Sequence, residues 1–168
     1  MKGLTSVLVR EPLYSLLSLL LLLGFFYFSY QGILMVSLNC ETPLMPVISN
    51  SMQHWDDSWR IPYEGRGDNT YRFPLQGGFE KGDLVVVRGV SSPSEIRVGD
   101  VVVYQRSPGV MPVVHRVWSL LENGEVLMVK GDANSLPDPP ISFQMVRGKV
   151  VAVLPNLGWL SLSVWRYG

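Results

Sequence analysis

Cysteine is nearly absent from this chain of 168 residues, in which Cys40 is the only one. A single cysteine excludes an intramolecular disulfide and any metal site built from several cysteines. The two histidines and the scattered carboxylates lack the spacing of metal ligands, so we expect neither a metal nor another cofactor. Net charge is also absent, because 14 basic and 14 acidic side chains balance. This balance removes the electrostatic case for nucleic acid as a partner.

Charge is missing altogether between Leu13 and Leu38, a stretch made mostly of leucine and aromatic residues. As a helix it is long enough to cross about 30 Å of hydrocarbon. A cleavable signal peptide is the competing interpretation, with an apolar region of about 7–15 residues and a small-residue cleavage site. Because the stretch is longer and no alanine precedes Ala133, we interpret it as a retained membrane anchor.

The orientation of the anchor follows from the basic residues beside it. Lys2 and Arg10 precede the apolar stretch, and the first charge after it is Glu41. The positive-inside rule then places residues 1–12 in the cytoplasm, residues 13–38 in the membrane and the domain of residues 41–168 outside. The membrane would be the cell membrane or, in a eukaryote, that of the endoplasmic reticulum.

The remainder of the chain has the pattern of a β-domain, with short β-branched runs separated by Gly, Pro and Asp. Two near-duplicates, beginning at Gly82-Asp83 and Gly99-Asp100, are predicted to form neighbouring strands of one sheet. The fold class is therefore mainly β, an antiparallel domain after a single helix. The predicted strands are Leu84–Val90, Val101–Gln105, Val113–Leu121, Val126–Val129 and Met145–Leu154.

Two segments do not fit this pattern. Residues 54–78 are rich in Trp, Tyr, Gly, Asp and Arg without a strand or helix period, which predicts a long loop or insertion. Within residues 150–168, the apolar run Val150–Val164 is broken by Pro155 and is short for a membrane span. With Trp159 and Trp165 this segment could lie at the membrane interface, where aromatic residues collect. A buried terminal strand is the alternative.

Three segments carry the groups that a serine nucleophile needs. Ser51 lies about a dozen residues after the anchor, and His115 lies at the centre of an alternating strand. Asp132 and Asp138 flank a polar turn, and the two prolines after Asp138 stiffen the chain. A serine, a histidine and an aspartate on separate segments can form a triad, which is recognised by geometry. The second histidine, His54, is the weaker candidate for the base because it lies on the irregular segment.

These segments match, in chain order, the motifs of a known family. The sequence resembles the type I signal peptidases of the archaeal and endoplasmic-reticulum kind, a branch of the serine peptidases. The matching segments are Ser49-x-Ser51-Met52, Gly82-Asp83, Gly99-Asp100, Val114-His115-Arg116-Val117, Lys130-Gly131-Asp132 through Asp138, and Leu154-Pro155-Asn156-Leu157-Gly158. In the bacterial branch a lysine occupies the position of His115. The chain departs from the family at His54, where a proline is frequent, and in the length of the segment 54–78.

The resemblance implies a role for each matching residue. Ser51 would be the nucleophile, His115 the general base and Asp138 the residue that orients it, with Asp132 in support. The Ser51 N–H and the Ser49 hydroxyl would form the oxyanion hole. The substrates would be secreted pre-proteins carrying signal peptides, cleaved after small side chains, and the chain would work in contact with membrane lipid and near the Sec translocon.

Two other functions fit the residues. In a serine–lysine dyad Lys130 would be the base, which requires a buried and deprotonated lysine and leaves His115 as a core residue. A membrane-anchored β-domain that binds partners without catalysis would use the Trp-rich loop from Trp55 to Tyr71 as its interaction surface.

Overall fold

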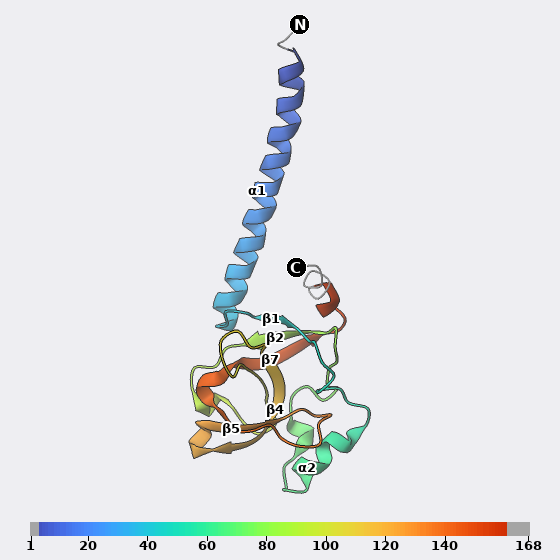
Figure 1. The fold of residues 1–168 in the computed structure, drawn as a ribbon, viewed down its shortest axis with the longest axis vertical. Coiled ribbons are helices and arrows are strands. Elements are labelled where there is room, and N and C mark those ends of the chain that lie inside the picture. The colour runs from blue at the N-terminus through green and yellow to red at the C-terminus, as the bar shows by residue number, and fades with distance from the viewer. Residues whose placement is uncertain (1–3, 161–168) are drawn as a thin grey trace. The chain divides into compact units, whose positions relative to one another are not determined.

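A computed structural model describes residues 4–160, with side chains from residue 13 onward (Figure 1). The chain divides into two units at the end of the first helix, residues 1–37 and residues 38–168. The first unit is helical and the second contains a sheet. We describe each unit by itself.

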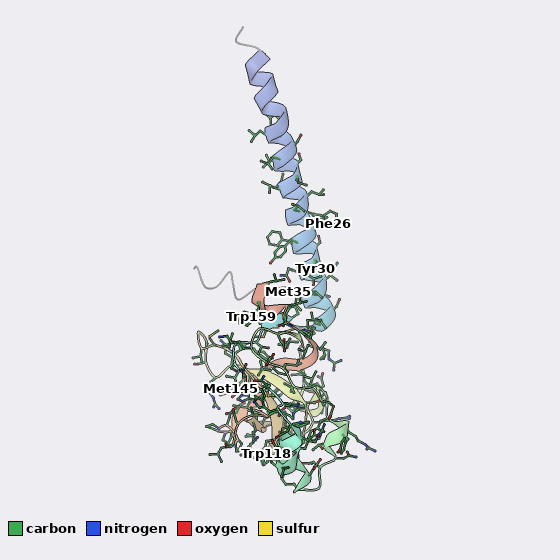
Figure 2. The ribbon with its side chains drawn as sticks, turned by 90° about the vertical axis from the view of Figure 1, so that its right-hand side faces the viewer. Phe26, Tyr30, Met35, Trp118, Met145 and Trp159 are labelled. Carbon is green, nitrogen blue, oxygen red and sulfur yellow. The ribbon has the colours of Figure 1, made fainter. Side chains whose placement is uncertain are left out.

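The first unit is formed by helix α1 (Leu4–Leu38). Among the described residues, its part from Leu13 to Leu38 is the one stretch long and apolar enough to cross a membrane. These 26 residues extend about 39 Å at about 1.5 Å per residue. Figure 2 shows Phe26 and Tyr30 projecting from the helix, and both side chains are more than half exposed. A helix that is apolar on all sides suits a lipid environment.

The second unit is built on a curled sheet of seven strands, in which every neighbouring pair is antiparallel (Figure 1). The spatial order is β1-β2-β7-β3-β4-β5-β6. This confirms the predicted fold class, a mainly β domain after one apolar helix. The strands are β1 (Leu44–Pro46), β2 (Leu84–Arg88), β3 (Val101–Tyr104), β4 (Val113–Leu121), β5 (Val126–Lys130), β6 (Ile141–Ser142) and β7 (Val146–Leu154).

All five predicted strands are confirmed, with ends that differ by at most two residues. The sequence did not predict β1 and β6, which have three and two residues and form the edges of the sheet. The prediction that the two Gly-Asp strands are neighbours is wrong. Both β2 and β3 pair with β7, which lies between them. The last strand of the domain therefore joins the two halves of the sheet.

Strand β3 is buried on both faces. Val101 and Val103 belong to one apolar core, with Val85 and Phe79, whereas Val102 and Tyr104 belong to a second core with Leu127 and Val129. A strand covered on both sides needs apolar residues at every position, which explains its unbroken valine run. The sheet thus separates two cores, and β3 contributes buried residues to both.

The segment 54–78 is packed and partly helical. It contains η1 (Asp57–Arg60), α2 (Ile61–Glu64) and η2 (Thr70–Arg72), turns too short to produce a helical period in the sequence. Tyr63 is fully buried, and its ring makes edge contacts with Trp59, Phe73 and Trp118 of β4. Of the aromatic residues from Trp55 to Tyr71 that suggested an interaction surface, Trp59 and Tyr63 are buried in this cluster, whereas Trp55 and Tyr71 are 81% and 77% exposed. Three further 3-10 turns are η3 (Pro93–Glu95), η4 (Glu122–Gly124) and η5 (Phe143–Met145).

The C-terminal segment 150–168 is only partly described. Its first residues complete β7, which ends at Leu154, and Trp159 beyond it is half exposed. The indole of Trp159 packs against Gly82, where a Cβ atom would lie 2.0 Å from its Nε1. Residues 158–160 are helical and not extended, whereas Trp165 and the rest of residues 161–168 lie outside the described residues.

Candidate active site

Ser51 lies on a segment that the fold anchors on both sides. Before it, the Val47 N–H donates to the carbonyl of Asp83 at 2.8 Å, and the Gly82 N–H donates back to Val47 at 3.0 Å. After it, Met52 is buried in the first core and its carbonyl accepts from the N–H of Phe79. The first Gly-Asp motif therefore fixes the backbone that presents the serine.

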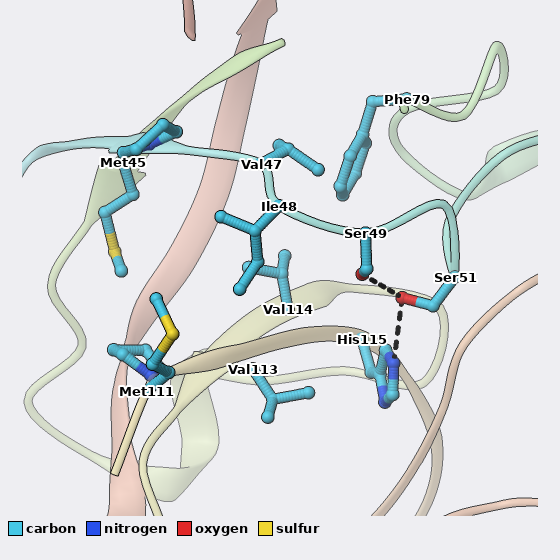
Figure 3. Close-up of a pocket in the computed structure, with 12 residues that line it drawn as sticks. Met45, Val47, Ile48, Ser49, Ser51, Phe79, Met111, Val113, Val114 and His115 are labelled. Carbon is cyan, nitrogen blue, oxygen red and sulfur yellow. Dashed lines mark hydrogen bonds between the residues drawn. The ribbon is translucent and has the colours of Figure 1, made fainter. Parts of the chain in front are cut away.

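His115 lies near the beginning of β4, opposite Val102 of β3. Its ring is nearly buried, with 8% of the side chain exposed, yet its Nε2 lies 3.1 Å from Ser51 Oγ (Figure 3). The alternation along β4 places His115 on the same face as Val113 and Val117, as the sequence predicted. The sheet therefore holds the imidazole firmly beside the serine hydroxyl.

Asp138 completes a Ser–His–Asp arrangement. Its Oδ2 forms a hydrogen bond with His115 Nδ1 and also accepts from the hydroxyl of Tyr104 at 2.8 Å. Its own N–H donates to Val129 of β5 at 2.8 Å, which fixes the backbone at this position. Because an ionised carboxylate only accepts hydrogen bonds, Nδ1 must be the protonated nitrogen. The lone pair of Nε2 is then directed at the Ser51 hydroxyl, the tautomer that a general base requires.

Tyr104 is a contact of this site that the sequence analysis missed. Burial and the hydrogen bond to Asp138 raise the pKa of Tyr104 to about 12, so its hydroxyl remains a donor at all physiological pH values. The signal was weak, because Tyr104 ends a valine run and resembles an ordinary core residue. Its hydroxyl nevertheless holds the carboxylate that faces the histidine.

Asp132 forms a second buried network behind the first. Arg116 donates to its carboxylate from Nε at 3.0 Å and from Nη2 at 2.7 Å, and His54 Nε2 lies 2.7 Å from Oδ2. Burial by itself raises the pKa of the Asp132 carboxyl, but the hydrogen bonds from His54 and Arg116 and the Arg116 charge more than offset it, so the pKa lies below its ordinary value. His54 therefore contacts Asp132, whereas His115 contacts Ser51.

The turn that carries the two aspartates also touches Ser51 directly. The N–H of Ala133 donates to the carbonyl of Ser51 at 2.9 Å. At Gly131, a Cβ atom would lie 2.8 Å from that same carbonyl oxygen, closer than real Cβ atoms approach. Glycine is therefore required at the middle position of the Lys130-Gly131-Asp132 motif so that the turn can pack on the Ser51 backbone.

Lys130 is buried beside this turn, and its Nζ donates to the carbonyl of Gly131 at 3.2 Å. Burial lowers the pKa of the Lys130 ammonium, and the charge of Asp132 opposes part of this effect. One condition for a lysine base is thus met, namely burial. The hydrogen bonds of Ser51 Oγ, however, go to His115 and to Ser49.

Ser49 lies next to Ser51, with its Oγ 3.2 Å from Ser51 Oγ (Figure 3). From this position its hydroxyl can donate toward an oxyanion that develops beside Ser51. The N–H of Ser51 belongs to the same turn, and backbone N–H groups are common donors in oxyanion holes.

An apolar cavity of about 480 Å³ opens beside the serine and the histidine. Figure 3 shows two extended segments that border it, one before Ser51 and one before His115. Met45 and Met111 narrow the far end of the cavity. An extended peptide laid between the two segments would bring a backbone carbonyl to Ser51 and its side chains into the cavity. The lining residues are Met45, Pro46, Val47, Ile48, Ser49, Ser51, Phe79, Met111, Pro112, Val113, Val114 and His115.

Ser51, His115 and Asp138 contact one another in this order at the mouth of an apolar cavity. Hydrolases that act by acyl transfer have this arrangement.

Comparisons with known proteins agree with this class. The chain is 33% identical, over 94% of its length and 85% of the relative's, to the signal peptidase complex catalytic subunit of Schizosaccharomyces pombe. It is 26% identical, over 95% of its length and 87% of the relative's, to the subunit of the same name from Yarrowia lipolytica. No family model matches the chain.

The chain therefore belongs to the family of signal peptidase complex catalytic subunits, as the motifs suggested, and it is a peptidase. The match extends over both the apolar helix and the β-domain, since it covers nearly the whole chain.

Proposed function

We propose that this protein is a membrane-anchored serine endopeptidase that removes N-terminal signal peptides from secreted pre-proteins. The observation that supports it most is the contact between Ser51 Oγ and His115 Nε2, at 3.1 Å, at the mouth of the apolar cavity. Family membership supports the substrate class, and the geometry supports the roles of the residues.

In the proposed reaction Ser51 attacks the scissile carbonyl while Nε2 of His115 takes its proton. Asp138, hydrogen-bonded to Nδ1, stabilises the imidazolium that forms. The oxyanion accepts hydrogen bonds from the Ser49 hydroxyl and the Ser51 N–H, each such donor contributing about 10²–10³ in rate. The imidazolium then protonates the leaving amine, and water hydrolyses the acyl-enzyme by the reverse sequence of proton transfers.

The substrate binds as an extended strand between the two segments that border the cavity. As the family resemblance implies, the side chains just before the cut are small, and the apolar cavity beside Ser51 receives them. Asp132 takes no proton in this mechanism and supports the turn that contacts Ser51.

The anchor places this chemistry at the membrane surface. Lys2 and Arg10 favour a cytoplasmic N-terminus, so the β-domain faces the other side of the membrane. There it meets pre-proteins whose signal segments are still in the lipid, close to the Sec translocon that delivers them. As a member of a family of complex subunits, the chain works with partner subunits.

The decisive experiment is an incubation of the purified full chain with a radiolabelled pre-protein, beside the variant Ser51→Ala. We expect a shortened product from the wild type and no product above background from Ser51→Ala, which should remain folded and membrane-bound. Undiminished cleavage by a folded Ser51→Ala protein would end the serine-peptidase interpretation.

A further inference from the structure

His54 is the residue at which this chain departs from the family motif, and its surroundings are unusual. It lies three residues after Ser51, at the beginning of the segment 54–78. Its side chain is almost fully buried, with 7% exposed, and its ring stacks on Trp59 with the centroids 4.5 Å apart. Gly78 also packs closely on the ring, since a Cβ atom there would lie 2.8 Å from the imidazole carbons.

Both ring nitrogens of His54 face groups that only accept hydrogen bonds. Nδ1 lies 3.0 Å from the carbonyl oxygen of Gln76, and Nε2 lies 2.7 Å from Oδ2 of Asp132. A neutral imidazole has one donor nitrogen and one acceptor nitrogen, so it can satisfy only one of these partners. Asp132 is ionised, because Arg116 and His54 hold its pKa below the ordinary value despite burial. The two contacts together require a donor at each nitrogen.

These contacts connect the segment 54–78 to the turn that holds the nucleophile. Through Gln76 the imidazole is bonded to the end of the segment, and through Asp132 to the turn. The next residue of that turn, Ala133, donates to the Ser51 carbonyl at 2.9 Å. A change at His54 would thus reach Ser51 through Asp132 and Ala133, without any contact between His54 and the substrate.

We propose that His54 is a positioning residue which, protonated on both ring nitrogens, fastens the segment 54–78 to the Asp132 turn and so aligns Ser51. The alignment rests on the proposed function of Ser51, whereas the protonation state does not. Deprotonation at higher pH removes one of the two hydrogen bonds and loosens the turn. Among charged groups, Asp132 contacts the ring, and Arg116 and Arg60 lie over the Trp59 indole stacked on it. Asp56 and Lys130 line the same cavity as His54.

The protonation state can be read directly, because the chain has only two histidines. The full chain, with ¹⁵N-labelled histidine and in detergent micelles, is studied by NMR at pH 7, and His54→Gln or His115→Gln assigns the two rings. We expect the His54 ring to carry protons on both nitrogens. A single neutral tautomer at His54 would overturn the proposal whether or not the protein cleaves pre-proteins.

The positioning role is tested by the pH dependence of kcat and KM for pre-protein cleavage. The glutamine of His54→Gln keeps one donor and is neutral at every pH. We expect its kcat at pH 7 to fall about tenfold or more with KM little changed, since small misplacements of reacting groups reduce the rate of the bound complex. We expect wild-type kcat to decline on the alkaline side of its pH profile and this decline to be absent in the variant.

The matched control is Asp57→Asn, which breaks an ion pair with Arg60 in the same segment. The partner of Asp57 is Arg60 and not a residue of the Asp132 turn. We expect its kcat and pH profile to match the wild type, because the Asp57 carboxylate is largely exposed. A His54→Gln enzyme with wild-type kcat, or with an unchanged alkaline limb, would overturn the positioning role while leaving the peptidase activity established.

Discussion

The replacement of Asp138 by asparagine tests the proposed catalytic geometry most sharply. Oδ2 of Asp138 accepts hydrogen bonds from both His115 Nδ1 and Tyr104. In place of the two carboxylate oxygens, an asparagine has one acceptor oxygen and one donor nitrogen. If the amide nitrogen faces His115, then Nδ1 must accept, and the proton moves to Nε2. The imidazole would then direct an N–H at Ser51 and could not take the serine proton.

The expected loss follows from this change of tautomer. Neutralising the orienting aspartate of a serine–histidine site reduces kcat by roughly 10³–10⁴. At about 1.4 kcal/mol for each factor of ten, this loss corresponds to about 4–5.5 kcal/mol of transition-state stabilisation. The packing hardly changes, because the two side chains have nearly the same shape. The effect should therefore appear in kcat rather than in folding.

The assay is cleavage of a radiolabelled pre-protein at saturating concentration, with circular dichroism as a check of folding. Tyr104→Phe is the matched control, since it removes one hydrogen bond from the same oxygen and leaves the carboxylate in place. We expect Tyr104→Phe to lose about tenfold or less, the value of one hydrogen bond of about 1 kcal/mol. Asp132→Asn should lose less kcat than Asp138→Asn. A folded Asp138→Asn enzyme within tenfold of wild type, or the opposite ranking of the two aspartates, would refute the assignment.

Three further predictions concern other parts of the molecule. Lys130→Ala should retain substantial cleavage whereas His115→Ala should not, and the opposite result in folded proteins would move the base to Lys130. Because the pKa of Asp132 is lowered in the folded protein, its contribution to stability should be complete above the unfolded carboxyl pKa of about 3.9 and be lost as the pH falls below that value. Thermal unfolding should show this decline in the wild type and a flatter one in Asp132→Asn. A cysteine placed at Gly65 in a Cys40→Ser background should be labelled from outside intact cells, and labelling only after the cells are opened would reverse the proposed orientation.

Much of the architecture could be predicted from local sequence. The apolar helix was visible because charge is absent over Leu13–Leu38, and the length and composition that suit a membrane span can be read from the sequence. The five main strands were visible as β-branched runs, since each is long enough to show its own pattern. Strands β1 and β6 were missed because three and two residues carry no period, and they are strands only through pairing with β2 and β5. The order of the sheet was also hidden, because β7 enters between β2 and β3 from the far end of the chain.

The candidate site, too, could be predicted from the sequence only in part. The sequence by itself determined which groups were available, because Ser51, His115 and the two aspartates lie in short motifs with recognisable chemistry. Only the tertiary structure decided how they pair: His115 with Asp138, and Arg116 and His54 with Asp132. Two aspartates on one turn, six residues apart, carry the same chemical group, and in the sequence only the family resemblance assigned Asp138 to His115. They differ because the turn directs one carboxylate toward the face of β4 that bears His115 and the other toward the face that bears Arg116. The alternation along β4 separates these two side chains, but which carboxylate lies near which of them is decided only when the sheet is assembled.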